Sequence, residues 1–206
     1  MSATDSSDAY PLPIPRRIIS THDTETGHAV FCTAFDETSP WSPFPNPSTG
    51  VPVRNIQLYS TSTFPVRGLS PQSAITSEAD ADADLKSYRK DLEAPVPPEV
   101  HSQATMCRIV DFPPRSVSDM HRTLTLDYVV ILDGSVEWSL DSGNSKVMRK
   151  GDVLVQRGTA HSWKNITPEQ ENGGWLRMFF VVLPIEKVVV KDGQALGPGL
   201  VVSSNN

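Results

Sequence analysis

The chain has only two cysteines, Cys32 and Cys107, among its 206 residues. A small secreted domain stapled by disulfides needs several cysteine pairs, so a disulfide framework is excluded. No flanking pattern indicates that either thiol is an activated nucleophile. We therefore expect both cysteines to be reduced and the protein to be cytoplasmic.

Long apolar runs and basic patches are also missing. No run approaches the ~20 residues that span a bilayer, and the first nine residues are polar and acidic, unlike a signal peptide. Lys and Arg number 18 against 24 Asp and Glu, which gives a net charge of -6. Because binding to nucleic acid needs clustered positive charge, we expect neither nucleic acid nor a membrane as a partner.

Proline and glycine, in contrast, are well represented. The 18 prolines and 12 glycines fit many short strands joined by turns better than they fit a helical bundle. A hydrophobic content of 38% over this length fills one core of ordinary size. The sequence thus predicts an all-β protein with a single domain.

Strand-sized apolar segments follow one another along the chain. They are residues 16–20 and 28–32, which form a hairpin, and then 53–61, 104–112, 135–140, 176–183 and 186–190. One segment departs from this pattern. Residues 77–94 are acidic and carry Leu85, Tyr88 and Leu92 at helical spacing, which predicts a short helix packed through these three side chains.

The stretch at 120–165 is the richest in polar groups set between apolar strands. It opens with His121, continues through Asp127 to a turn at Gly134, and closes with Gly158 and His161. A β-barrel presents site residues in this way, because its strands form a rigid scaffold and polar side chains at their ends point into the mouth.

This stretch resembles the cupin superfamily. The first cupin motif contains His-x-His, then Glu, then Gly, and the second ends in Gly-x-x-His-x-x-x-Asn. The positions that keep this frame are His121, Asp127 and Gly134 for the first motif, and Gly158, His161 and Asn165 for the second. The variant as a whole also resembles small single-domain cupins encoded with fungal secondary-metabolite pathways.

The resemblance implies a double-stranded β-helix barrel, jelly-roll-like, with an N-terminal hairpin arm and one short helical insertion. We expect a flexible arm over 1–15, a cupin domain over 16–190 with its motif core at 120–165, and a tail over 191–206. Cupins are commonly dimers that share N-terminal strands, so a homodimer is expected.

Several positions depart from the family pattern. Thr123 stands where the second metal-binding histidine would be, and Asp127 replaces the glutamate. The interval from Gly151 to Gly158 is one residue short, and the pair 156–157, Gln-Arg, replaces the proline segment. These departures put the complete cupin metal site in doubt.

The resemblance implies that His121, Asp127 and His161 are the remaining metal ligands. Two histidines and one carboxylate with open positions suit Zn or Fe(II). The alternative is a degenerate pocket in which both histidines are only hydrogen-bonded, and the two interpretations stay open. Nothing in the sequence points to an organic cofactor.

Without a metal, the same residues form an acid/base site. His121 and His161 can move protons at neutral pH, Asp127 can orient one of them, and Arg122 can bind a carboxylate or phenolate. Further side chains with positions that could reach the substrate are Thr123, Gln156, Trp163 and Arg177.

The resemblance implies an enzyme that acts on an oxygenated, largely apolar small molecule of polyketide-like character. Lyase or isomerase chemistry (dehydration, decarboxylation or enolisation) is favoured because acid/base groups or a Lewis-acid metal suffice for it. An Fe(II)-dependent oxygenase and a non-catalytic binding cupin remain the alternatives.

Overall fold

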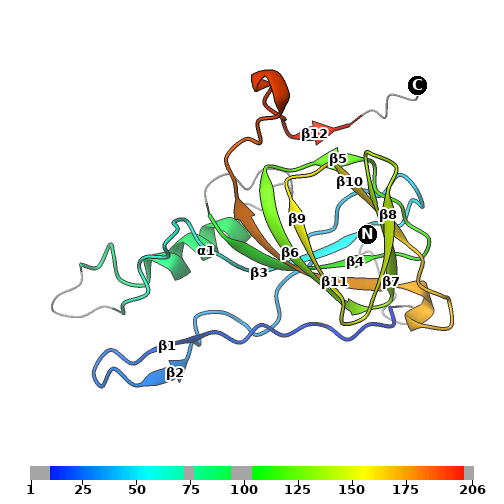
Figure 1. Ribbon diagram of the computed structural model, residues 1–206. Helices are drawn as coiled ribbons and strands as arrows, with labels where there is room; N and C mark the ends of the chain where they lie inside the picture. The colour runs from blue at the N-terminus through cyan, green and yellow to red at the C-terminus, as the bar shows by residue number, and fades with distance from the viewer. Residues whose placement is uncertain (1–9, 72–76, 94–103, 202–206) are drawn as a thin grey trace, which may run out of the picture.

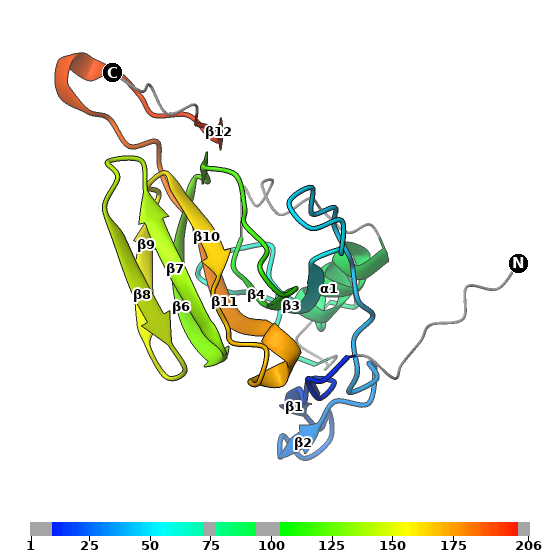
Figure 2. The same ribbon diagram turned by 90° about the vertical axis from the view of Figure 1, so that its right-hand side faces the viewer.

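The computed structural model describes residues 10–71, 77–93 and 104–201. Two five-stranded antiparallel sheets face each other and form a double-stranded β-helix barrel, as predicted (Figures 1 and 2). The first sheet has the order β3 (Arg54–Ser60), β4 (Met106–Phe112), β11 (Leu176–Pro184), β6 (Thr125–Asp133) and β9 (Val153–Arg157). The second has the order β12 (Gly199–Leu200), β5 (His121–Arg122), β10 (His161–Asn165), β7 (Ser135–Leu140) and β8 (Ser145–Arg149).

The core lies between the inner faces of the two sheets. Along β6, the side chains of Asp127, Val129 and Ile131 are buried. Tyr128, which lies between Asp127 and Val129 in the sequence, points outward and is 45% exposed. Met178 and Phe180 repeat this period of two on β11. Successive strand side chains point to opposite faces, so alternate apolar residues build one core. Burying each such side chain contributes ~1.5–3 kcal/mol.

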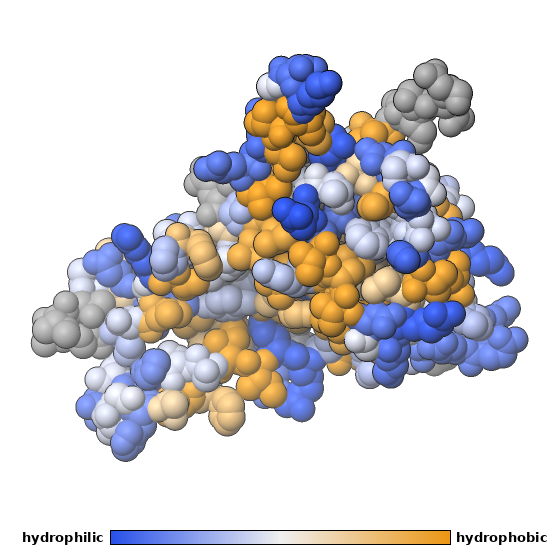
Figure 3. Space-filling view, viewed as in Figure 1, coloured by the Kyte–Doolittle hydropathy of each residue, from blue (hydrophilic) through white to orange (hydrophobic). Residues whose placement is uncertain are grey.

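The single α-helix, α1 (Ala83–Glu93), covers the outer face of β3, which confirms the predicted insertion. Its Tyr88 is fully buried, and the Tyr88 ring centroid lies 4.8 Å from that of Tyr59 on β3. No helix of the described residues covers the outer face of β6 and β9, and Figure 3 shows apolar side chains gathered there. Val153 is 61% exposed and Val155 is 45% exposed. Two short 3-10 turns, Asn172–Gly174 and Lys191–Gly193, complete the helical elements of the described chain, and none of these could cross a membrane.

The N-terminal hairpin consists of β1 (Ser20–His22) and β2 (Ala29–Phe31) and lies below the barrel in the view of Figure 1. Its first strand begins later than predicted, because Arg17 is buried and donates hydrogen bonds to Ser39 and to the Tyr88 hydroxyl. Phe31 at the hairpin is 75% exposed. The homodimer expected to form through this arm stays a prediction.

The structure corrects the sequence-based expectations for both ends of the chain. Part of the predicted arm contacts the barrel: Leu12 is buried, and the Pro13 carbonyl accepts a hydrogen bond from Arg177. Residues 1–9 lie outside the described chain. The strand predicted at 186–190 is wrong, since only Val189 forms an isolated bridge there. The tail returns to the barrel as β12 and pairs with β5, and residues 202–206 are not among those described.

Candidate functional site

Two imidazoles lie side by side at one end of the barrel. His161 opens β10 and pairs in register with His121 on β5. The centroids of the two rings are 4.4 Å apart and the ring planes are inclined by 49°. The two motif segments that the sequence singled out are therefore neighbours in the second sheet.

The turn before His161 explains why its ring reaches this place. Gly158 ends β9 with a φ of 61°, a region that favours glycine, and a Cβ there would meet the side chain of Ile185 at 2.6 Å. The chain then turns back into β10. Along β10, His161 and Trp163 alternate with exposed or half-buried residues, so both face the barrel interior.

The histidines form part of the wall of a cavity of about 800 Å³. Its apolar wall consists of Phe44, Val53, Val110, Phe112, Trp163 and Phe180. Its polar wall includes Arg108, His121, Arg122, Thr123, Asp127 and His161. An apolar cavity with a few convergent polar groups is the usual form of a small-molecule site.

Asp127 lies on the inner face of β6 and is only 5% exposed. Burial raises the pKa of this carboxyl, against a hydrogen bond from Thr125 and the positive charges of Arg108 and His121. Its Oδ1 atom is buried and has no hydrogen-bond partner within the described chain. A buried acceptor left without a donor is costly, so this oxygen favours a donor supplied by a ligand.

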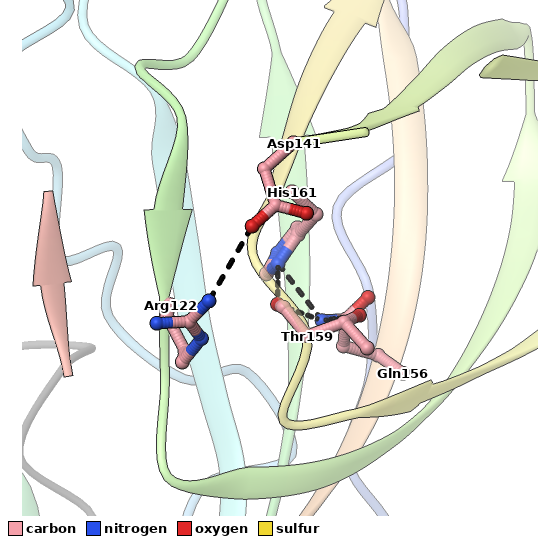
Figure 4. A network of polar contacts seen from close by, with 5 residues as sticks. All are labelled: Arg122, Asp141, Gln156, Thr159 and His161. Atoms are coloured by element: carbon pink, nitrogen blue, oxygen red, sulfur yellow. Dashed lines mark hydrogen bonds and ion pairs between the residues drawn. The ribbon is translucent and has the colours of Figure 1, made fainter. Parts of the chain in front are cut away.

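Burial has the opposite effect on the pKa of His161. It lowers the pKa of this imidazole to about 4, helped by the charge of His121 and opposed by a hydrogen bond with the Thr159 backbone. His161 is therefore neutral at neutral pH. On the side of the ring shown in Figure 4, its Nδ1 lies 2.9 Å from Nε2 of Gln156 and 3.0 Å from the carbonyl oxygen of Thr159.

His121 is held by the segment that precedes its strand. Its Nδ1 atom lies 2.8 Å from the carbonyl oxygen of Asp119. The next residue, Arg122, also lines the cavity, and its guanidinium lies 3.4 Å from a carboxylate oxygen of Asp141 (Figure 4). Thr123 follows and accepts a hydrogen bond of 2.7 Å from the Thr125 hydroxyl.

Among the described residues, the three predicted metal ligands do not come together as one group. In the parts of the chain that the structure describes, no three His, Cys, Asp or Glu side chains are grouped closely enough to hold an ion. His121 and His161 are adjacent, but Asp127 does not complete the set with them. The adjacent imidazoles are the part of the predicted ligand set that the structure brings together, and metal binding stays a prediction.

Two of the predicted substrate contacts are corrected by the structure. Gln156 is fully buried behind His161, where its amide contacts Thr159 and the imidazole instead of the cavity. Arg177 lies on the opposite face of β11 and forms an ion pair of 2.7 Å with Asp111. Trp163 and Thr123, in contrast, line the cavity.

Arg108 is a cavity residue that the sequence analysis did not include in the site. Its guanidinium carbon lies 5.3 Å from the centroid of the Phe180 ring, and its charge reaches Asp127. The period of two along β4 was an available signal, because Arg108 shares its face with the cavity residues Val110 and Phe112. The contributions of the loop around Phe44 and of Leu200 carried no comparable signal.

Comparison with curated proteins finds relatives over most of the chain. The chain is 35% identical over 197 residues to phomopsin biosynthesis cluster protein D of Diaporthe leptostromiformis, covering 96% of this chain and 92% of that protein. It is 33% identical over 189 residues to oryzines biosynthesis cluster protein J of Aspergillus oryzae, covering 92% and 93%.

A further relative is the cupin-domain-containing oxidoreductase virC of Hypocrea virens, 40% identical over 135 residues. That match covers 66% of this chain and 61% of the relative, so the chain spans less than two thirds of that protein. Among solved structures, the polyketide cyclase RemF from Streptomyces resistomycificus has a TM-score of 0.44 and 12% identity, over 81% of this chain and 82% of that one. No family model matches the sequence.

Proposed function

Because this chain belongs to the cupin proteins of fungal secondary-metabolite biosynthesis, we propose that it is an enzyme that moves protons on an oxygenated, largely apolar small molecule. The reaction class is lyase or isomerase: dehydration, decarboxylation or enolisation. The observation that carries the proposal is the pair of adjacent imidazoles at the polar wall of a cavity of about 800 Å³ whose other walls are apolar.

The cavity offers an apolar wall to the carbon skeleton of such a substrate and a polar wall to its oxygen atoms. Phe112, Trp163 and Phe180 offer apolar and aromatic surface to the carbon skeleton. Arg108 and Arg122 place positive charge where oxygen atoms of the substrate would acquire negative charge. The imidazoles can then remove a proton next to a carbonyl group, or give one to a departing hydroxyl group; a positioned acid or base of this kind contributes roughly 10²–10⁴-fold in rate.

Exchange of carbon-bound hydrogen tests the proposal without knowledge of the natural substrate. Benzylacetone in heavy water probes enolisation, and the aldol adduct of benzaldehyde and acetone probes dehydration. We expect the full chain to incorporate deuterium next to the ketone, or to dehydrate the adduct, faster than buffer. His121→Ala and His161→Ala should each lower that rate at least about a hundredfold, while His22→Ala, on the exposed hairpin, should not change it.

Two outcomes would overturn the proposal. If both pocket variants keep the wild-type rate, the histidines are not the acid/base groups. If the cavity binds benzylacetone but no exchange or dehydration exceeds the buffer rate, the protein is better described as a binding cupin.

A second candidate is an oxidoreductase, favoured by the name of the relative virC. That activity needs a redox partner, and the described residues do not assemble a three-ligand site for iron. Metal analysis of protein purified without added metal, together with oxygen consumption on the same two probes, separates the candidates. Stoichiometric iron with substrate-dependent oxygen uptake would favour oxidation over proton transfer.

A further inference from the structure

We propose that Asp119 and Gln156 hold the two pocket histidines in opposite tautomers, so that His121 presents an unprotonated Nε2 and His161 presents an Nε2–H. The arrangement makes one ring an acceptor of protons and the other a donor of hydrogen bonds. Its use in catalysis rests on the proposed function, but the tautomers follow from the contacts of the free protein.

The tautomer of His121 follows from its backbone partner. Nδ1 lies 2.8 Å from the carbonyl oxygen of Asp119, and a carbonyl oxygen can only accept a hydrogen bond. Nδ1 must therefore carry the hydrogen. In the neutral imidazole this leaves a lone pair on Nε2, which is the form required of a general base.

His161 has a different neighbour at the same ring atom. The amide nitrogen of Gln156 lies 2.9 Å from Nδ1, and it also lies 2.5 Å from the carbonyl oxygen and 2.8 Å from the hydroxyl of Thr159. An amide nitrogen can only donate. If one of its two hydrogens goes to the Thr159 carbonyl and the other to Nδ1, then Nδ1 is an acceptor and the hydrogen of the neutral ring is on Nε2.

The competing arrangements are less favourable. A hydrogen on Nδ1 could donate to the Thr159 carbonyl at 3.0 Å, but it would then stand beside a donor nitrogen of Gln156 at 2.9 Å. Exchanging the oxygen and nitrogen of the Gln156 amide would set two acceptors, its oxygen and the Thr159 carbonyl, 2.5 Å apart.

Opposite tautomers define the class of substrate more narrowly. With ring centroids 4.4 Å apart, the two Nε2 edges suit a carbonyl group and the C–H bond next to it. The proton passes from carbon to Nε2 of His121, the C–H electron pair forms the C=C bond, and the carbonyl π pair moves onto oxygen, which accepts a hydrogen bond from His161 Nε2–H. The proton then returns from His121 to carbon as the C=O bond re-forms. With a β-hydroxyl group, the oxygen pair instead re-forms the C=O bond, the C=C pair forms the double bond between the α and β carbons, and the Cβ–O bond breaks, its pair leaving with the hydroxyl group, which takes the proton from His121 and departs as water. We infer that the substrate is an enolisable ketone, with or without a β-hydroxyl group.

Long-range proton–nitrogen correlation NMR of the full chain, with isotope-labelled histidine nitrogen and no ligand, tests the tautomers directly. At neutral pH we expect one ring with hydrogen on Nδ1 and another with hydrogen on Nε2, assigned to His121 and His161 by the loss of each signal in His121→Gln and His161→Gln. The same tautomer at both rings would overturn the inference.

Gln156→Glu sharpens the test, because a carboxylate only accepts and should move the hydrogen of His161 to Nδ1. With benzylacetone, kcat for exchange should fall about a hundredfold, as expected when one donor to a developing oxyanion is lost, and KM should change little. Gln57→Glu, the same substitution outside the cavity, is the matched control and should alter neither signal nor rate. Gln156→Met removes the donor without adding charge and should cause the same tautomer change.

The results separate this inference from the proposed function. If His161 keeps its hydrogen on Nε2 in both Gln156 variants, the role of Gln156 is refuted, whatever the rates are. If the wild-type rings show opposite tautomers but no probe exchanges, the tautomer assignment holds and the proposed function fails.

Discussion

Two clusters of buried polar side chains differ in how completely their members are partnered. On the outer face of β11, Arg177 donates two hydrogen bonds of 2.7 Å to Asp111, one of 2.7 Å to the Pro13 carbonyl and one of 3.0 Å to the Tyr10 hydroxyl. The Tyr10 hydroxyl in turn donates to Asp111. This cluster fastens residues 10–13 to the barrel.

The second cluster lies around the cavity, and some of its buried polar atoms lack a hydrogen-bond partner within the described chain. Oδ1 of Asp127 and Nε of Arg122 are buried, and the described chain offers neither of them a hydrogen bond. Satisfied buried groups stabilise a fold, whereas groups left short of partners around a cavity mark a place prepared for a ligand. The comparison thus favours an architectural role for the first cluster and supports the site proposed for the second.

The largest expected effect concerns the architectural cluster. Arg177→Met leaves the Asp111 carboxylate, which is fully buried, without its cation. Breaking a buried ion pair in this way costs about 3–5 kcal/mol, so the midpoint of urea unfolding should fall strongly. Arg16→Met is the matched control, because Arg16 and Glu37 are 62% and 53% exposed and their pair should contribute under about 1 kcal/mol. Equal losses in the two variants would contradict the assignment.

A smaller effect is expected from the protonation of His161. Its pKa is lowered to about 4 by burial, so between pH 6.5 and that value the unfolded chain binds a proton that the folded chain does not. The stability contributed by neutral His161 is therefore present above the unfolded pKa and is lost as the pH falls. From pH 7 to pH 5 this amounts to about 2 kcal/mol.

Urea unfolding at the two pH values measures this loss. His161→Phe should reduce the fall in stability between pH 7 and pH 5, since the group that titrates is gone, whereas His22→Gln on the exposed hairpin should leave the fall unchanged. The raised pKa of Asp127 acts in the opposite sense, because the folded chain there retains a proton that the unfolded chain loses. A fall that is identical in His161→Phe and wild type would show that His161 titrates normally.

The smallest effect on stability is expected for an arginine of the cavity. Arg122 and Asp141 are 14% and 42% exposed at the side chain, and their closest N–O distance is 3.4 Å. Arg122→Met should change the free energy of unfolding by less than about 1 kcal/mol. It should instead raise KM for benzylacetone if Arg122 holds the ketone oxygen. A destabilisation as large as that of Arg177→Met would place Arg122 in the architecture.

The two histidines could be placed from the sequence because motif spacing and strand pairing are linked. His121 and His161 stand at the starts of short strands bounded by turns, and a barrel brings such strand ends together. The strand β11 was likewise predicted, because residues 176–183 form a strand-sized apolar run. The strand assignment depends on the local sequence pattern, and the placement of the two histidines depends on the spacing of the cupin motifs.

Arg177 and Gln156 could not be placed correctly by the same reasoning. A charge in an apolar strand needs a partner, but the sequence does not say which one, and Arg177 has its partner on the face opposite to Met178 and Phe180. Gln156 does face the interior, yet the ring of His161 takes up its amide before any ligand could. Which polar group meets which depends on contacts between distant segments, and strand pattern alone does not encode those.

The short strand β12 has a consequence for how such pockets diversify. Gly199 and Leu200 pair only with β5, opposite Arg122 and His121, yet both residues line the cavity. An edge strand of this kind belongs to the last part of the chain and contributes nothing to the core cluster between the sheets. Substitutions at Gly199 and Leu200 can therefore reshape the mouth of the pocket without changing the core cluster between the sheets.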